Sequence, residues 1–139
     1  MLNAITELNW LAIILATSAY FILGGLWFAP FAFRKLWDRA IGFSRPEEWK
    51  PSAKFFAGPL IGCFTASIAT SMLISALNID SYIEAVILGL IVGIGYAGSV
   101  SFVNAITPTN PHPFLLGAVT GIYHLLGVIL VAIIIVALG

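Results

Sequence analysis

Four long apolar segments constrain this chain more than any other feature of its sequence. They cover approximately residues 8–29, 53–77, 82–107 and 114–138. At a rise of about 1.5 Å per residue, a helix formed by each segment is long enough to cross the roughly 30 Å hydrocarbon core of a bilayer. A membrane barrel would need shorter strands with alternating apolar and polar positions, and these segments do not alternate. The pattern predicts an all-α integral membrane protein, a four-helix bundle in a single domain over residues 1–139.

The composition agrees with a membrane protein. Hydrophobic residues make up 60% of the chain and charged residues 9%, and the mean hydropathy is +1.06. Soluble domains carry about 25% charged residues, which a water-exposed surface requires. The formal net charge is zero, so the chain has no overall basic field that would attract nucleic acid. We therefore expect the lipid bilayer, and not nucleic acid, to be a partner.

An amphipathic segment over 31–42 separates the first two apolar segments. Its helical pattern places Phe33, Leu36, Trp37 and Ile41 on one face and Arg34, Lys35, Asp38 and Arg39 on the other. Such a pattern predicts a helix that lies in the membrane interface and ends at Gly42. Docking of the apolar face onto a partner protein is the alternative. Residues 44–47 then resemble a capping box and predict a short helix through Trp49.

The distribution of charge predicts the orientation in the membrane. The basic residues of the chain are Arg34, Lys35, Arg39, Arg45, Lys50 and Lys54. All of them lie between the first two spans or at their ends, whereas Glu7, Asp80 and Glu84 lie on the other side of the membrane. Because cytoplasmic loops are enriched in Lys and Arg, we expect the 31–54 region in the cytoplasm and both termini outside. The expected location is the cell (inner) membrane, as a multi-pass protein.

Small residues recur four positions apart in three of the spans. The glycines of these ridges are Gly58, Gly62, Gly89, Gly93, Gly117 and Gly121. Small side chains let helices approach closely, which is a main source of helix–helix attraction in lipid. The ridges have two interpretations. They pack the helices of one bundle together, or one of them faces a second copy or a partner subunit.

His124 is the titratable residue expected near the middle of a span, roughly 15 Å from the start of the fourth apolar segment. Ionisable groups in the membrane are costly and often functional. Its imidazole could bond a hydroxyl on a neighbouring helix. It could bind a ligand or relay protons, with the further candidates Tyr20, Tyr96, Tyr123 and Asn104. It could also ligate a haem or a chlorophyll-type pigment, although no cofactor is predicted and no metal-ligand spacing is present.

Aromatic and glycine motifs have simple explanations. Trp10, Trp27 and Trp37 lie where membrane interfaces are expected and are interpreted as interface anchors. Residues 93–98 match the dinucleotide-binding pattern of glycines, but they lie inside an apolar span, so we interpret them as packing residues. The sequence shows no paired nucleophile and base, and we expect the protein not to be an enzyme.

Several short motifs resemble the domain-of-unknown-function 1761 family of small bacterial four-span membrane proteins. They are residues 9–12, 25–30 and 35–37, the pair Tyr123 and His124, and Asn104 before that pair. The resemblance covers nearly the whole chain. Phe28 and Arg34 stand where the family pattern often has Tyr and Gly. The resemblance implies the four-span fold and implies no activity.

The sequence leaves two classes of function open. The first is a non-catalytic membrane protein that acts through helix association, either as a homo-oligomer or as an accessory subunit of a larger membrane complex. The alternative is a small transporter or a carrier of a hydrophobic ligand, with a polar path near His124.

Overall fold

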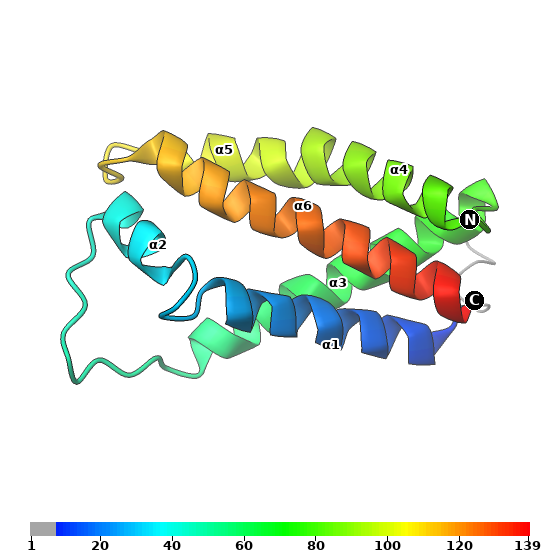
Figure 1. The fold of residues 1–139 in the computed structure, drawn as a ribbon, viewed down its shortest axis with the longest axis horizontal. Helices are drawn as coiled ribbons and strands as arrows, with labels where there is room; N and C mark the ends of the chain where they lie inside the picture. The colour runs from blue at the N-terminus through cyan, green and yellow to red at the C-terminus, as the bar shows by residue number, and fades with distance from the viewer. Residues whose placement is uncertain (1–7) are drawn as a thin grey trace.

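The structure is a computed structural model that describes residues 8–139; Glu7 and the residues before it lie outside the described part. Residues 8–139 contain helices and no strands, so the predicted all-α fold is confirmed (Figure 1). The elements are α1 (Trp10–Trp27), α2 (Arg34–Ile41), α3 (Lys54–Leu77), α4 (Tyr82–Val92), the π-helix η2 (Gly93–Gly98), α5 (Ser99–Ala105) and α6 (Pro113–Leu138).

Within residues 8–139, four helices are long and apolar enough to cross a membrane: α1, α3, the continuous stretch Tyr82–Ala105 and α6. The protein is therefore a multi-pass membrane protein. Two of the helices end near prolines. α1 stops at Trp27, shortly before Pro30, and α5 stops at Ala105, shortly before Pro108. Proline cannot donate the next helical hydrogen bond and disfavours helical geometry in the residue before it, so it limits helices in this way.

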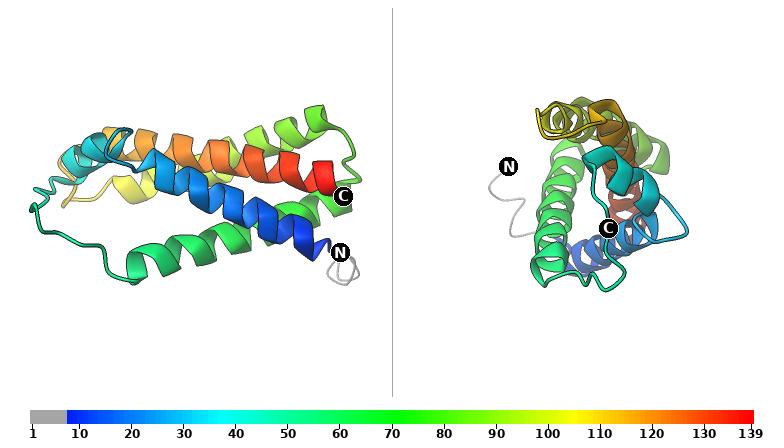
Figure 2. Two further views of the ribbon diagram at one scale, coloured as in Figure 1. Left: turned by 60° about the horizontal axis from the view of Figure 1, so that its bottom comes forward. Right: turned by 90° about the vertical axis from the view of Figure 1, so that its left-hand side faces the viewer.

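The central element of the fold is α6. It packs against α1, α2, α3, α4, η2 and α5, whereas α1 and α3 pack against each other and not substantially against the Tyr82–Ala105 span. Figure 1 shows α6 lying between the α4–α5 helix and α1, and the end-on view in Figure 2 shows α3 and α5 on different sides of it. The Tyr82–Ala105 span is thus held to the rest of the bundle mainly through its contacts with α6.

Glycines of α4 and η2 allow this close packing against α6. A Cβ atom on Gly89 would lie 2.7 Å from the Cα of Ile129, and one on Gly93 would lie 3.0 Å from the Cα of Leu125. Backbone atoms cannot yield as a flexible side chain can. In this structure Gly89 and Gly93 thus lie where the helices of one bundle approach closely.

The glycines of α6 also allow neighbouring helices to approach closely. A Cβ atom on Gly117 would lie 2.9 Å from the ring of Phe102, and one on Gly121 would lie 3.6 Å from the Cα of Gly98. Both glycines are buried. They allow α5 and η2 to lie against the N-terminal half of α6, as the ridge pattern indicated.

The ridge on α3 behaves differently. A Cβ atom on Gly58 or Gly62 would meet nothing within 4 Å in the described chain, and residues 54–62 are all exposed. The buried face of α3 carries Cys63, Ser67 and Ile74 instead, which lie on another side of the helix. For Gly58 and Gly62, the interpretation as packing residues within one bundle is therefore wrong.

The third span contains a π-helical turn that the sequence analysis did not predict. It covers Gly93–Gly98, where the hydroxyl of Ser99 donates to the carbonyl of Ile94 at 3.0 Å. Glycine at three of these six positions removes the side chains that would crowd a widened turn. The motif that resembles a dinucleotide-binding pattern is thus this irregular turn.

The predicted short helix through Trp49 is wrong. This stretch contains a turn, in which the Trp49 amide donates to the carbonyl of Pro46 at 3.1 Å. The guanidinium of Arg45 donates to both carboxylate oxygens of Asp38, at 2.9 and 2.6 Å, and stacks over the ring of Trp49. These hydrogen bonds raise the pKa of Arg45 above its ordinary value. They also tie the loop back to α2, which competes with helix formation.

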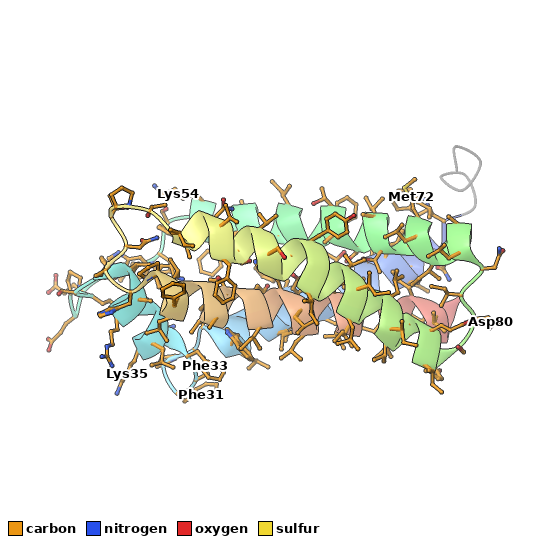
Figure 3. The ribbon with its side chains drawn as sticks, turned by 90° about the horizontal axis from the view of Figure 1, so that it is seen from above. Phe31, Phe33, Lys35, Lys54, Met72 and Asp80 are labelled. Atoms are coloured by element: carbon orange, nitrogen blue, oxygen red, sulfur yellow. The ribbon has the colours of Figure 1, made fainter. Side chains whose placement is uncertain are left out.

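α2 forms within the predicted amphipathic segment and ends at Gly42, whose φ of +67° suits glycine. Part of its apolar face packs on the bundle and is not free to enter the lipid. The ring of Phe33 lies 4.2 Å from that of Trp27, and Ala40 is fully buried. Phe31, just before the helix, remains 81% exposed (Figure 3). The expectation that the whole apolar face enters the leaflet is therefore corrected.

Candidate functional site

A cluster of polar and aromatic side chains lies where α1, α3 and α6 meet. It contains Tyr20 on α1, Cys63 on α3, and Tyr123 and His124 on α6. A hydrogen bond joins the Tyr20 hydroxyl to Nδ1 of His124 over 2.6 Å. This bond links two helices within the apolar spans, where water cannot replace either partner. The bond agrees with the first interpretation of His124, in which the imidazole bonds a hydroxyl on a neighbouring helix.

Tyr123 completes the cluster from the other side. Its ring centroid lies 5.4 Å from that of Tyr20, and its hydroxyl lies 3.8 Å from the Sγ of Cys63. Both tyrosines are almost fully buried, with 3% and 6% of their surface exposed. Rings packed at this distance add to the apolar burial and fix the position of the hydroxyls.

Two glycines that the sequence analysis did not assign to the site make room for these rings. A Cβ atom on Gly24 would lie 2.7 Å from the hydroxyl oxygen of Tyr123, and one on Gly127 would overlap the ring of Tyr20. Glycine pairs four apart were the pattern that identified the ridges, and neither Gly24 nor Gly127 belongs to such a pair. The sequence feature that could have identified Gly24 and Gly127 is only that each lies within about one helical turn of an aromatic residue.

Other hydroxyls of α1 and α3 are not hydrogen-bonded to His124. Ser18 and Thr65 donate to carbonyls of their own helices. The hydroxyl of Thr17 is buried and has no hydrogen-bond partner. His124 itself is half-buried, and its Nε2 makes no hydrogen bond within residues 8–139.

Tyr96 and Asn104 lie away from this cluster. Tyr96 belongs to η2 and is 71% exposed, and Asn104 is exposed near the end of α5. The structure thus brings together Tyr20, Tyr123 and His124, without a continuous path through Tyr96. Asn110 caps the end of α5, because its side-chain amide donates to the carbonyl of Ala105 at 2.8 Å.

The predicted interface tryptophans occupy different environments. Trp10 is 48% exposed at the start of α1. Trp27 is half-buried, and its indole N–H donates to the carbonyl of Val119 at 3.1 Å, so it joins α1 to α6. Trp37 is half-buried, with its ring centroid 6.2 Å from that of Phe28. Within residues 8–139, no three His, Cys, Asp or Glu side chains lie close enough to hold a metal ion.

Comparison with known families assigns the chain. The model of a family described as "Protein of unknown function (DUF1761)" matches residues 11–136. The chain belongs to the DUF1761 family. The match includes the cluster residues Tyr20, Cys63, Tyr123 and His124. Comparisons of this DUF1761 protein with curated proteins and with solved structures find no match.

Removing the Tyr20 hydroxyl tests the link between α1 and α6. We expect Tyr20→Phe to lower the free energy of unfolding by about 1 kcal/mol, because His124 loses its partner inside the apolar bundle. The same change should have almost no effect in a His124→Ala background. Reversible unfolding in mixed micelles that contain SDS would measure both values.

Tyr96→Phe is the matched control, since it removes a hydroxyl from an exposed tyrosine. It should change the free energy of unfolding by less than about 0.5 kcal/mol. Equal effects of Tyr20→Phe in the presence and absence of His124 would show that the two side chains are not coupled.

Proposed function

We propose that this DUF1761 protein acts through helix association in the membrane, without catalysis, as a homo-oligomer or as an accessory subunit of a larger membrane complex. The observation that carries the proposal is the outward position of Gly58 and Gly62 on α3. In contrast to Gly89, Gly93, Gly117 and Gly121, these glycines meet no neighbour in the described chain.

An exposed glycine ridge suits contact with another helix. Gly58 and Gly62 are separated by about one helical turn, so their exposed backbone forms a shallow strip on α3. Lipid tails are as apolar as leucine, and helices therefore attract one another mainly through close van der Waals contact across small residues. Each glycine also makes helix formation less favourable by about 1 kcal/mol relative to Ala. Packing contacts with another helix would offset this cost.

A groove beside this ridge would add surface to the contact. It has a volume of about 370 Å³ and is lined by residues of α1 and α3: Ile14, Thr17, Ser18, Leu60, Ile61 and Phe64. Leu60 and Ile61 lie in the same turn of α3 as the glycines. An apolar side chain from a neighbouring helix would fill the groove while that helix rests on the ridge.

Filling the ridge tests this proposal. The double variant Gly58→Leu/Gly62→Leu should weaken self-association about tenfold, because two leucines hold the helices apart. Energy transfer between donor-labelled and acceptor-labelled copies, followed as the protein is diluted with lipid, would measure the change. Gly25→Leu is the matched control, since Gly25 on α1 also meets nothing within 4 Å.

Three results would contradict the homo-oligomer. They are a wild-type protein that stays monomeric at every lipid ratio, equal association of wild type and double variant, and an equal loss in the Gly25→Leu control. For the accessory-subunit form, the same double variant should lose membrane proteins that co-purify with the wild type from native membranes. Identical co-purification from both would contradict that form.

We further propose that the 31–54 region faces the cytoplasm of a bacterial cell and that α2 lies at the inner leaflet of its inner membrane. Lys35 and Lys54 lie at one end of the molecule and Asp80 at the other (Figure 3). Asp38 is paired with Arg45, which leaves the basic side chains of α2 in excess. Each of these close to anionic headgroups could contribute about 1 kcal/mol.

Labelling from one side of the membrane tests the orientation. In a Cys63→Ala background, Glu48→Cys should react with an impermeant maleimide only after the cells are permeabilised, and Gly139→Cys should react in intact cells. Glu48 is exposed in the loop between α2 and α3, and Gly139 follows α6 at the other end (Figure 1). The reverse pattern of labelling would contradict the proposed orientation.

A further inference from the structure

A pocket of about 280 Å³ opens at the end of the bundle that carries Asp80. Its polar lining comes from Asn9 before α1, from Ser71 and Ser75 on α3, and from Asp80 in the loop after α3. Isoleucine and valine side chains of α3, α6 and the same loop form its apolar wall. The start of α1 and the end of α6 are joined here, since the Asn9 amide donates to the carbonyl of Leu138 at 2.8 Å.

The charges around this pocket favour a cation. Asp80 contributes a carboxylate. α3 and α6 both end at the pocket, and the C-terminal end of each helix carries a partial negative charge of about half an electron. The six basic residues of the sequence all lie between positions 34 and 54, at the other end of the chain's spans.

Ser71 gives this pocket a hydroxyl that the fold itself does not use. The neighbouring hydroxyls of Ser67 and Thr70 donate to carbonyls one turn earlier, each at 2.8 Å. Ser71 is only 5% exposed, and no hydrogen bond joins its side chain to another of residues 8–139. Its hydroxyl can therefore bond a polar group that enters the pocket.

We propose that this pocket binds a primary ammonium group, supplied by the headgroup of an aminophospholipid or by a free alkylamine. A primary ammonium has three N–H donors and one positive charge. The Asp80 carboxylate matches the charge, and the hydroxyls of Ser71 and Ser75 accept the remaining hydrogen bonds. The apolar wall then contacts the carbon atoms next to the nitrogen.

A metal ion fits this pocket less well. Divalent cations prefer several carboxylate or carbonyl oxygens around a compact centre. Among the described residues of the lining, Asp80 is the single carboxylate side chain, and half of these residues are apolar. The proposal does not depend on helix association, because Gly58 and Gly62 lie outside the pocket.

Binding to the purified full chain tests the proposal. Native mass spectrometry would compare retention of phosphatidylethanolamine and phosphatidylcholine with identical acyl chains, since the choline headgroup has no N–H donor. We expect the wild type to favour phosphatidylethanolamine about tenfold and Asp80→Asn to lose the preference, because the charge-assisted hydrogen bond is gone. Thermal unfolding with butylamine hydrochloride would test the free amine.

Glu84→Gln is the matched control. Glu84 is a carboxylate at the same end of the bundle, but it accepts a hydrogen bond from Ser81 at 3.0 Å and does not line the pocket. The Glu84→Gln variant should keep the lipid preference of the wild type. Ser71→Ala should weaken the preference several-fold, and it provides a second variant if Asp80→Asn does not fold.

The outcomes distinguish the two sources of the ammonium. A lipid preference that requires Asp80 identifies the headgroup. Stabilisation by butylamine that requires Asp80, without a lipid preference, identifies a free amine. Equal retention of both lipids by the wild type, together with no stabilisation by butylamine, would overturn the proposal. So would a preference that survives in both Asp80→Asn and Ser71→Ala.

Discussion

The close approach of α6 to its neighbours is the contact on which the rest of the structure depends. α6 is the common neighbour of the other helices, and α4 and η2 reach it only because Gly89 and Gly93 carry no side chain. A larger residue at either position would meet the backbone of α6 itself. Because the Tyr82–Ala105 span packs little against α1 and α3, its contacts with α6 hold it in place.

The same arrangement brings the polar groups of the interior together. Tyr20 fits against α6 only over Gly127, and in that position its hydroxyl reaches His124. Close packing and hydrogen bonding are therefore one feature of this bundle. A polar side chain in an apolar span must find a partner within the protein, and α6 supplies it.

The sequence predicts the spans well, because the length of an apolar run is a local property. It does not predict which way each span faces. The four spans carry apolar side chains on the faces toward the lipid as well as toward the interior, so no amphipathic pattern distinguishes the two. Gly58 and Gly62 have the same spacing as Gly89 and Gly93. The first pair nevertheless faces outward, whereas the second pair faces α6.

The candidate site shows the same limit. His124 was identifiable as an ionisable residue in an apolar span, and Tyr20 was among its possible partners. That Tyr20 is the partner depends on how two helices 104 positions apart are rotated against each other. Tyr96 and Asn104 were equally plausible from composition, and the π-helical turn and the end of α5 place them at the surface.

Glycines that face α6 and glycines that face outward should respond differently to an added methyl group, and comparing Gly89 with Gly58 tests this difference most directly. Reversible unfolding in micelles should show that Gly89→Ala lowers the free energy of unfolding by about 1–3 kcal/mol, because the new methyl group meets the backbone of Ile129. Gly58→Ala adds the same methyl group in open space and should leave stability unchanged or slightly raised. Equal losses in both variants, or a loss only in Gly58→Ala, would contradict this account.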